Sequence, residues 1–233
     1  MKLALFDLDH TLLPIDSDHS WGVFTTELGW NDPVVFAQRN DDFYAHYQAG
    51  TLDIHDYVRF ATLAARERGA AAAARAHDRY MDEVIRPRIT TEALALVRSH
   101  QQAGDTVMIV TATNEFVTRP IAQAFGVHEL IAVELERDAS GWITGEIQGT
   151  PSFREGKVTR VAQWLAQQGL SWDDVEMSFY SDSMNDLPLL EKAHHPVATN
   201  PDARLRQLAT ERGWRILELF QDCLLYTSDA ADE

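Results

Sequence analysis

Near its N-terminus the chain reads Leu3-Ala4-Leu5-Phe6-Asp7-Leu8-Asp9-His10-Thr11. A short apolar run that ends abruptly in acids is typical of a buried parallel strand whose carboxyl end opens into a crevice. Because side chains alternate along an extended segment, we expect Asp7 and Asp9 to face the same side and to be able to share one cation. Two acids in an ordinary turn would give the same pattern, so the pair alone does not establish a site.

Similar apolar segments recur along the chain and indicate further strands. The run at 106–110 leads into Thr111-Ala112-Thr113-Asn114, and the run at 177–180 leads into Ser181-Asp182. The remaining predicted elements are strands at 131–135, 142–144, 196–199 and 214–217, and helices at 115–125, 158–168 and 202–212. Strands that alternate with helices predict an α/β fold, in which a parallel sheet is covered by helices on both faces.

The segment 14–88 has a different character, because its apolar residues recur at helical spacing and it contains no convincing strand. We interpret these residues as the core of a helical bundle rather than as a ligand site; they include Trp21, Phe24, Phe43, Tyr47 and Tyr57. The sequence thus predicts a core domain made of residues 1–13 and 89–222, with a helical cap domain, 14–88, inserted into it. Residues 223–233 do not continue the pattern, and we interpret them as a non-native tail.

The composition limits the possible partners. Of the 233 residues, 45% are hydrophobic, which is ample for a buried interior. The 36 Asp and Glu against 20 Lys and Arg give a formal net charge of −16, which repels nucleic acid and anionic membrane surfaces. No apolar run is long enough to span a membrane, and the single cysteine, Cys223, has no partner for a disulfide within the chain. We therefore expect a cytoplasmic protein without nucleic-acid or membrane partners, while the oligomeric state stays open.

The polar residues that follow the strands are expected to converge, because the carboxyl ends of parallel strands meet at one edge of the sheet. Asp182 and Asp186 then join Asp7 and Asp9, and several carboxylates suit a hard cation such as Mg²⁺. The same segment also reads as the start of a helix capped by Ser183 or Asn185, and both interpretations can hold together.

Phosphate binding is predicted by two further residues. Thr111 offers a hydroxyl, and backbone N–H groups in the turn after it, from Ala112 on, can hold phosphate oxygens. Lys157 can neutralise charge on a phosphoryl group that is being transferred. Taken singly, Thr111 can equally be a helix cap, and a lone lysine is usually a solvated charge.

These residue types point to phosphoryl-transfer chemistry. A carboxylate such as that of Asp7 can attack a phosphoryl group, forming an aspartyl-phosphate that divides one difficult displacement into two easier ones. The carboxyl of Asp9 can protonate the leaving alkoxide and then, as a base, take a proton from the water that releases phosphate.

In order and spacing the chain resembles the four motifs of the haloacid dehalogenase superfamily: Asp7-x-Asp9-x-Thr11, Thr111, Lys157 and Ser181-Asp182-x-x-Asn185-Asp186. The resemblance extends from Leu3 to about Leu217 and implies a three-layer Rossmann-like core, with Thr111 and Lys157 as phosphate holders. It also implies Mg²⁺ as the cofactor, bound by Asp7, the backbone carbonyl of Asp9 and Asp182, with Asp186, Thr11 and Asn185 in support.

The helical insertion is similar to the cap of the subgroup that contains phosphoserine phosphatases. Asp16 falls where those enzymes carry a glutamate that meets the amino group of the substrate, which implies an amine here too; Asp18, Arg59 and Arg66 are further candidate contacts. A Ser-Gly-Gly stretch of that subgroup is replaced by Thr111-Ala112-Thr113, whose side chains would crowd a backbone cradle for a carboxylate. This departure looks like the branch that includes histidinol-phosphate phosphatases, whose substrate has an amine but no carboxylate.

The leading hypothesis is Mg²⁺-dependent hydrolysis of a small phosphomonoester through an aspartyl-phosphate, on an amine-bearing metabolite such as histidinol phosphate or phosphoserine. A phosphotransferase or phosphomutase would use the same residues but pass the phosphate to a second hydroxyl. A receiver-like signalling module also accepts phosphate on a strand-end aspartate. Asp9 and the helical insertion argue against the module, because a stable phospho-switch needs neither a hydrolytic base nor a lid.

Overall fold

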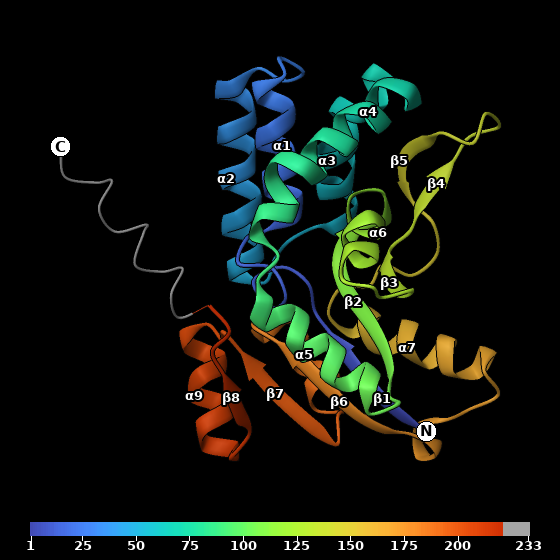
Figure 1. The fold of residues 1–233 in the computed structure, drawn as a ribbon. Helices are drawn as coiled ribbons and strands as arrows, with labels where there is room; N and C mark the ends of the chain where they lie inside the picture. The colour runs from blue at the N-terminus through green and yellow to red at the C-terminus, as the bar shows by residue number, and fades with distance from the viewer. Residues whose placement is uncertain (221–233) are drawn as a thin grey trace.

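A six-stranded parallel sheet lies at the centre of the protein, which is described for residues 1–220 by a computed structural model (Figure 1). The strand order is β3-β2-β1-β6-β7-β8. The strands are β1 (Lys2–Phe6), β2 (Thr106–Asn114), β3 (Glu129–Val133), β6 (Glu176–Ser181), β7 (His195–Thr199) and β8 (Arg215–Leu217). Because β1 pairs with β2 on one side and with β6 on the other, these three strands end next to one another at the carboxyl edge of the sheet. The predicted α/β class is confirmed.

Helices cover both faces of the sheet, as the sequence predicts. One face packs against α5 (Thr91–Gln102) and α6 (Glu115–Ala124), and the other against α7 (Glu155–Gln167), α8 (Leu187–Leu190) and α9 (Ala203–Arg212). Along β1 the side chains alternate between the two apolar clusters: Ala4 and Phe6 join the first, and Leu3 and Leu5 join the second. A strand that is buried on both sides therefore reads as a continuous apolar run.

The segment between β1 and α5 is helical throughout its described elements and forms the upper part of Figure 1. It contains α1 (Ser17–Glu27), α2 (Pro33–Ala49), α3 (Ile54–Arg68), α4 (Ala70–Tyr80), the π-helical turn η1 (Met81–Ile85) and the 3₁₀ turn η2 (Arg86–Arg88). Trp21 and Phe24 are buried, in the same apolar cluster as Phe6, so the helices share one core with the sheet. Within residues 1–220, no helix combines the length and the apolarity needed to cross a bilayer.

Some element boundaries differ from the prediction because strand pairing extends or interrupts them. β2 continues past Val110 to Asn114, where it still pairs with β3 after a shift in register. The strand predicted at 131–135 is divided at Glu134 into β3 and β4 (Leu135–Arg137), and β4 forms an antiparallel hairpin with β5 (Ile143–Ile147). The interpretation of 223–233 as a tail falls outside the described residues.

Candidate active site

A cavity of about 1230 Å³ lies where the carboxyl edge of the sheet faces the inserted helices. All the predicted strand-end clusters contribute to its lining, through Asp7, Asp9, Thr111, Ala112, Lys157, Asp182, Asn185 and Asp186. The inserted helices supply the opposite wall, which includes Asp16, His19, Asn40, Phe43, Tyr47 and Tyr57. The interpretation of Phe43, Tyr47 and Tyr57 as bundle core holds only in part. Phe43 packs against Tyr57 across α2 and α3, but all three side chains are only half-buried and line the cavity.

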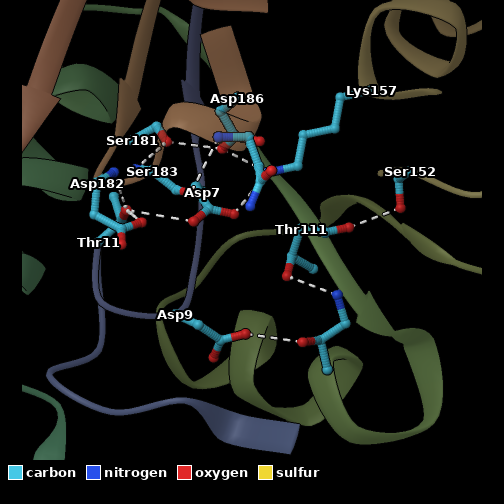
Figure 2. Close-up of polar contacts among 12 residues, drawn as sticks. Asp7, Asp9, Thr11, Thr111, Ser152, Lys157, Ser181, Asp182, Ser183 and Asp186 are labelled. Carbon is cyan, nitrogen blue, oxygen red and sulfur yellow. Dashed lines mark hydrogen bonds and ion pairs between the residues drawn. The ribbon is translucent and has the colours of Figure 1, made fainter. Parts of the chain in front are cut away.

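Lys157 and two acids form a buried ion-pair cluster at the base of the cavity (Figure 2). The Lys157 Nζ atom lies 2.8 Å from Asp7 Oδ1 and 2.7 Å from Asp186 Oδ2. Burial alone would lower the pKa of Lys157, but the attraction of Asp186 and Asp7 outweighs it and raises this pKa above its ordinary value. Lys157 is therefore a permanently charged group beside Asp7, the carboxylate that the sequence predicts as a nucleophile.

Thr11 connects the first strand end to the third. Its hydroxyl lies 3.4 Å from Asp7 Oδ2 and 3.2 Å from Asp182 Oδ1, and it accepts a hydrogen bond from the Asp182 amide at 3.1 Å. The distances to the two carboxylates are long for O–H···O bonds, so the contacts mark proximity more than strong binding. Asp7 and Asp182, 175 positions apart in the numbering of the chain, thus meet at one point, as the sequence predicts.

The charges at this point leave room for a further cation. Burial, and then repulsion by Asp7 and Asp186, raises the pKa of Asp182 well above its ordinary value. Burial also raises the pKa of Asp186 to about 6, although Lys157 lowers it. Within residues 1–220 no three His, Cys, Asp or Glu side chains are already grouped as a metal site. Lys157 offsets only one of the three acidic charges that Asp7, Asp182 and Asp186 can carry, so their oxygens nevertheless fit a hard cation, because such cations prefer oxygen ligands.

Asp9 stands apart from this cluster, towards Thr111 (Figure 2). Its Oδ1 accepts a hydrogen bond from the Ser17 amide at 2.8 Å, and its Oδ2 accepts one from the Thr113 hydroxyl at 2.8 Å. Burial, followed by repulsion from Asp16 and Asp7, raises the pKa of Asp9 well above its ordinary value. A carboxyl with a raised pKa can hold a proton near neutral pH and give it up, as a general acid and base must.

Two of the residues predicted to hold phosphate, Thr111 and Ala112, lie on the extended end of β2. The Thr111 hydroxyl accepts a hydrogen bond from the Thr113 amide at 3.1 Å, so its own proton is free to be donated to a phosphate oxygen. The buried Ser152 hydroxyl holds the Thr111 carbonyl at 2.7 Å. Thr111 does not cap the following helix, because Asn114 is the N-cap of α6.

The candidate substrate contacts in the inserted helices separate into two groups. Asp16 lines the cavity and is the N-cap of α1, where its Oδ1 accepts hydrogen bonds from the amides of Asp18 and His19. Asp18 is buried outside the cavity lining, and its Oδ1 accepts a hydrogen bond from Asn114 Nδ2 at 3.2 Å. Arg59 and Arg66 also lie outside the lining, where Arg59 pairs with Glu146 and Arg66 donates to the Thr144 carbonyl.

Several residues of the site were not predicted from the sequence. Thr113 was noted only as a source of crowding, yet its hydroxyl contacts Asp9. Tyr47 of α2 reaches Ser183 across the cavity, with 3.2 Å between the two hydroxyl oxygens. Arg154 lines the cavity with a positive φ of 53° and donates to Asn185 Oδ1 at 3.2 Å. The spacing of Thr111 and Thr113 is the only sequence signal that points to any of these contacts, because it fits one face of a strand.

Comparison with known proteins places the chain in a family. The family model for haloacid dehalogenase-like hydrolases matches residues 4–191. A histidinol-phosphatase of Neisseria meningitidis is 42% identical over 217 residues, which cover 93% of this chain and 98% of that protein. A phosphoserine phosphatase of Mycobacterium tuberculosis is 30% identical over 216 residues, covering 91% of this chain and 69% of that protein.

Solved structures agree with this placement. A protein of unknown function from Bordetella pertussis has a TM-score of 0.88 and 49% identity, and the match covers 94% of this chain and 99% of that one. A substrate-bound phosphoserine phosphatase has a TM-score of 0.64 at 15% identity, over 93% and 92% of the two chains, which shows the shared fold. With its strand-end carboxylates, its buried lysine and its family match all in agreement, the chain belongs to the haloacid dehalogenase-like hydrolases.

Proposed function

We propose that this hydrolase is a phosphatase of small phosphomonoesters that uses Asp7 as its nucleophile and Asp9 as its general acid and base. The observation that carries the proposal is the placement of both carboxyls on one cavity, Asp7 beside the charged Lys157 and Asp9 in a separate, hydrogen-bonded position. One carboxylate is thus paired with a cation, and the other has a raised pKa. Such a division between two acids is typical of a nucleophile and a proton donor.

The reaction takes two steps. An oxygen of Asp7 attacks phosphorus, the bond from phosphorus to the ester oxygen breaks, and the departing alkoxide takes the proton of Asp9. Asp9, now a carboxylate, then removes a proton from water, and the resulting hydroxide attacks phosphorus. The Asp7–phosphorus bond breaks, which frees inorganic phosphate and restores the carboxylate. During both steps Lys157 and Thr111, which line the cavity, would hold the non-bridging oxygens.

Mg²⁺ is the cation that best suits the remaining charge. Asp7 and Asp182 would hold it together with the backbone carbonyl of Asp9, and Asp186 would support Lys157. When bound, it would neutralise charge on the phosphoryl group and so allow the Asp7 carboxylate to approach a phosphate dianion.

The cap side of the cavity favours a substrate that carries an amine. Asp16 raises the pKa of Asp9 by repulsion, so the two acids lie close together. Negative charge is therefore concentrated where Asp9 would protonate the leaving group. Asp16 Oδ2 makes no hydrogen bond among the described residues, which leaves an acceptor for an ammonium group. Ala112 and Thr113 add side chains where a carboxylate would need open backbone. These features, with the similarity to a histidinol-phosphatase, support histidinol phosphate over phosphoserine.

The proposal is tested by comparing phosphate release by the wild type, Asp7→Asn and Asp16→Asn. The ester panel is histidinol phosphate, phosphoserine, a sugar phosphate and p-nitrophenyl phosphate, with saturating Mg²⁺. We expect Asp7→Asn to release no phosphate from any ester, because the amide is not a nucleophile. Turnover that survives this substitution would disprove the mechanism, and phosphate that appears on an added alcohol instead of water would indicate a phosphotransferase.

The Asp16→Asn variant isolates the charge of the proposed amine contact. Asparagine caps a helix about as well as aspartate does, so α1 should stay intact. We expect kcat/KM to fall about tenfold or more for histidinol phosphate and to change little for p-nitrophenyl phosphate, which has no amine; about tenfold corresponds to the loss of one charge-assisted hydrogen bond. Equal effects on both esters would argue against an amine-bearing substrate.

A further inference from the structure

Both oxygens of the Asp9 carboxyl are held, and they are held by different parts of the molecule. The Ser17 amide, at the start of α1, donates to Oδ1 at 2.8 Å. The Thr113 hydroxyl, at the end of β2, donates to Oδ2 at 2.8 Å. Two hydrogen bonds at opposite oxygens fix the rotation of a carboxyl group as well as its position. A carboxylate has about four acceptor sites, so sites remain for the proton that moves in the reaction.

Thr113 is itself placed by several contacts. It is buried, with 7% of its surface exposed, and its amide donates to the Thr111 hydroxyl at 3.1 Å. The carbonyl of Thr111 is held in turn by Ser152, and Asn114, the next residue along, donates to the buried Asp18. The β-branched threonine side chain is also stiff at its first torsion angle. The hydroxyl thus sits on a rigid support, although β2 shifts its register against β3 between Val110 and Asn114.

The rigidity of this support matters because Asp9 has two chemical roles, proton donor and proton acceptor, at the same position. In the proposed mechanism it gives a proton to the leaving oxygen and later takes one from water, so it must keep the same position through both steps. Small errors in the placement of a reacting group are costly, and side chains that serve as catalysts are usually fixed by others. The Ser17 contact comes from the inserted helices, whereas the Thr113 contact comes from the sheet that also carries Asp7.

We propose that Thr113 is a positioning residue of Asp9: its hydroxyl fixes the carboxyl for proton transfer to the leaving oxygen and, in the second step, from water. The inference rests on the proposed function, because it assumes that Asp9 is the proton donor. It assigns to Thr113 no contact with the reacting phosphorus. The loss of rate when the Thr113 hydroxyl is removed should therefore depend on how much the leaving group needs a proton.

The test compares kcat/KM for two kinds of ester in the wild type, Thr113→Val and Thr113→Ser. An alkyl ester, histidinol phosphate or phosphoserine according to which the wild type turns over faster, needs its leaving alkoxide protonated. The p-nitrophenolate of p-nitrophenyl phosphate leaves without a proton. We expect Thr113→Val, which keeps the shape but loses the hydroxyl, to lose about tenfold or more on the alkyl ester and less than about threefold on the aryl ester. Thr113→Ser should stay near the wild type on both.

Controls separate this inference from the proposed function. Asp9→Asn should show the same selectivity between esters at larger amplitude; if it affects both esters equally, the assignment of Asp9 fails. If Asp9→Asn is selective but Thr113→Val lowers both esters alike, or lowers neither, the role of Thr113 is overturned. Thr113→Ala serves as a second variant if the valine disturbs folding, which thermal unfolding would reveal, and the same selective loss is expected from it.

Discussion

At the scale of single residues, Asp18 shows how burial changes the role of an acid. It lies on α1 but contacts the sheet side of the molecule, where Asn114 donates to it. Burial, and then repulsion by Asp16, raises the pKa of Asp18 to about 7, although hydrogen bonds from Tyr57 and Asn114 lower it. The side chain is therefore a link between the inserted helices and the core, which differs from the substrate contact that its place in the sequence predicts.

Replacing Asp18 should change how stability depends on pH. An unfolded aspartate has a pKa of about 3.9, so between about pH 4 and 7 the folded protein binds a proton that the unfolded chain has released. The contribution of Asp18 to stability is complete below about pH 4 and is lost as the pH rises through about 7. We expect Asp18→Asn, which keeps the hydrogen bonds, to raise the free energy of unfolding by about 1–3 kcal/mol at pH 8 and by clearly less at pH 5.5.

Urea unfolding followed by circular dichroism at both pH values measures the effect of Asp18→Asn. Asp42→Asn, on the exposed surface of α2, is the matched control and should change stability little at either pH. An equal gain at both pH values would show that ionisation of Asp18 does not destabilise the fold.

At the scale of elements, α2 is held to its neighbours by a few aromatic contacts. None of its described side chains is fully buried, yet it supplies Asn40 and Tyr47 to the cavity wall. Phe36 packs over Gly22 of α1, where an added Cβ would lie 2.2 Å from the ring, and it stacks on Phe60 at 5.4 Å between centroids. The position of the cavity wall thus depends on the absence of a side chain at Gly22.

Gly22→Ala should therefore be destabilising, against the usual preference of helices for alanine. In an open helix the change stabilises by about 1 kcal/mol. Here the ring of Phe36 must move, and overpacking of this kind costs about 1–3 kcal/mol. We expect a lower free energy of unfolding and a higher KM, because α2 is displaced at the cavity. In a Phe36→Ala background the Gly22→Ala change should become neutral or stabilising. A double-mutant cycle that shows no coupling between the two positions would refute the packing argument.

At the scale of the whole molecule, buried acids link folding to protons and to metal. The pKa values of Asp9, Asp18, Asp182 and Asp186 are all raised, chiefly by burial. Each of these groups binds its proton more readily in the folded chain, so its contribution to stability is present at low pH and is lost as the pH rises through its folded pKa. The metal-free protein should accordingly become less stable between about pH 4 and values above 7.

Mg²⁺ should offset this loss, because it binds ionised carboxylates and competes with protons. At about 100 times its dissociation constant a ligand stabilises by about 3 kcal/mol, which corresponds to roughly 5–10 °C in Tm for a chain of this size. We expect a shift of that order at pH 8 and a much smaller one at pH 5.5, measured by differential scanning fluorimetry against KCl of equal ionic strength. Asp182→Asn should abolish the shift; an equal shift in that variant would place the metal elsewhere.

Much of the fold can be read from local patterns. The apolar runs of β1, β2 and β6 and the polar residues after them are properties of contiguous sequence, and parallel strands bring their carboxyl ends together whatever the rest of the chain does. The prediction was less successful where the environment of a residue depends on distant partners. Phe43, Tyr47 and Tyr57 have the helical spacing of core residues, but they line the cavity, which leaves them less covered than core residues.

The sequence by itself determined the chain's α/β architecture, its helical insertion and the identity of the acids and the lysine, because hydrophobic periodicity and strand-end chemistry are encoded locally. The tertiary structure alone decided which of these groups touch. Thr113 and Asp9 are 104 positions apart, and no local pattern announces the hydrogen bond between them. Such a contact arises only when separate strands and helices pack together, and at that point burial and the fields of neighbouring charges give each side chain its function.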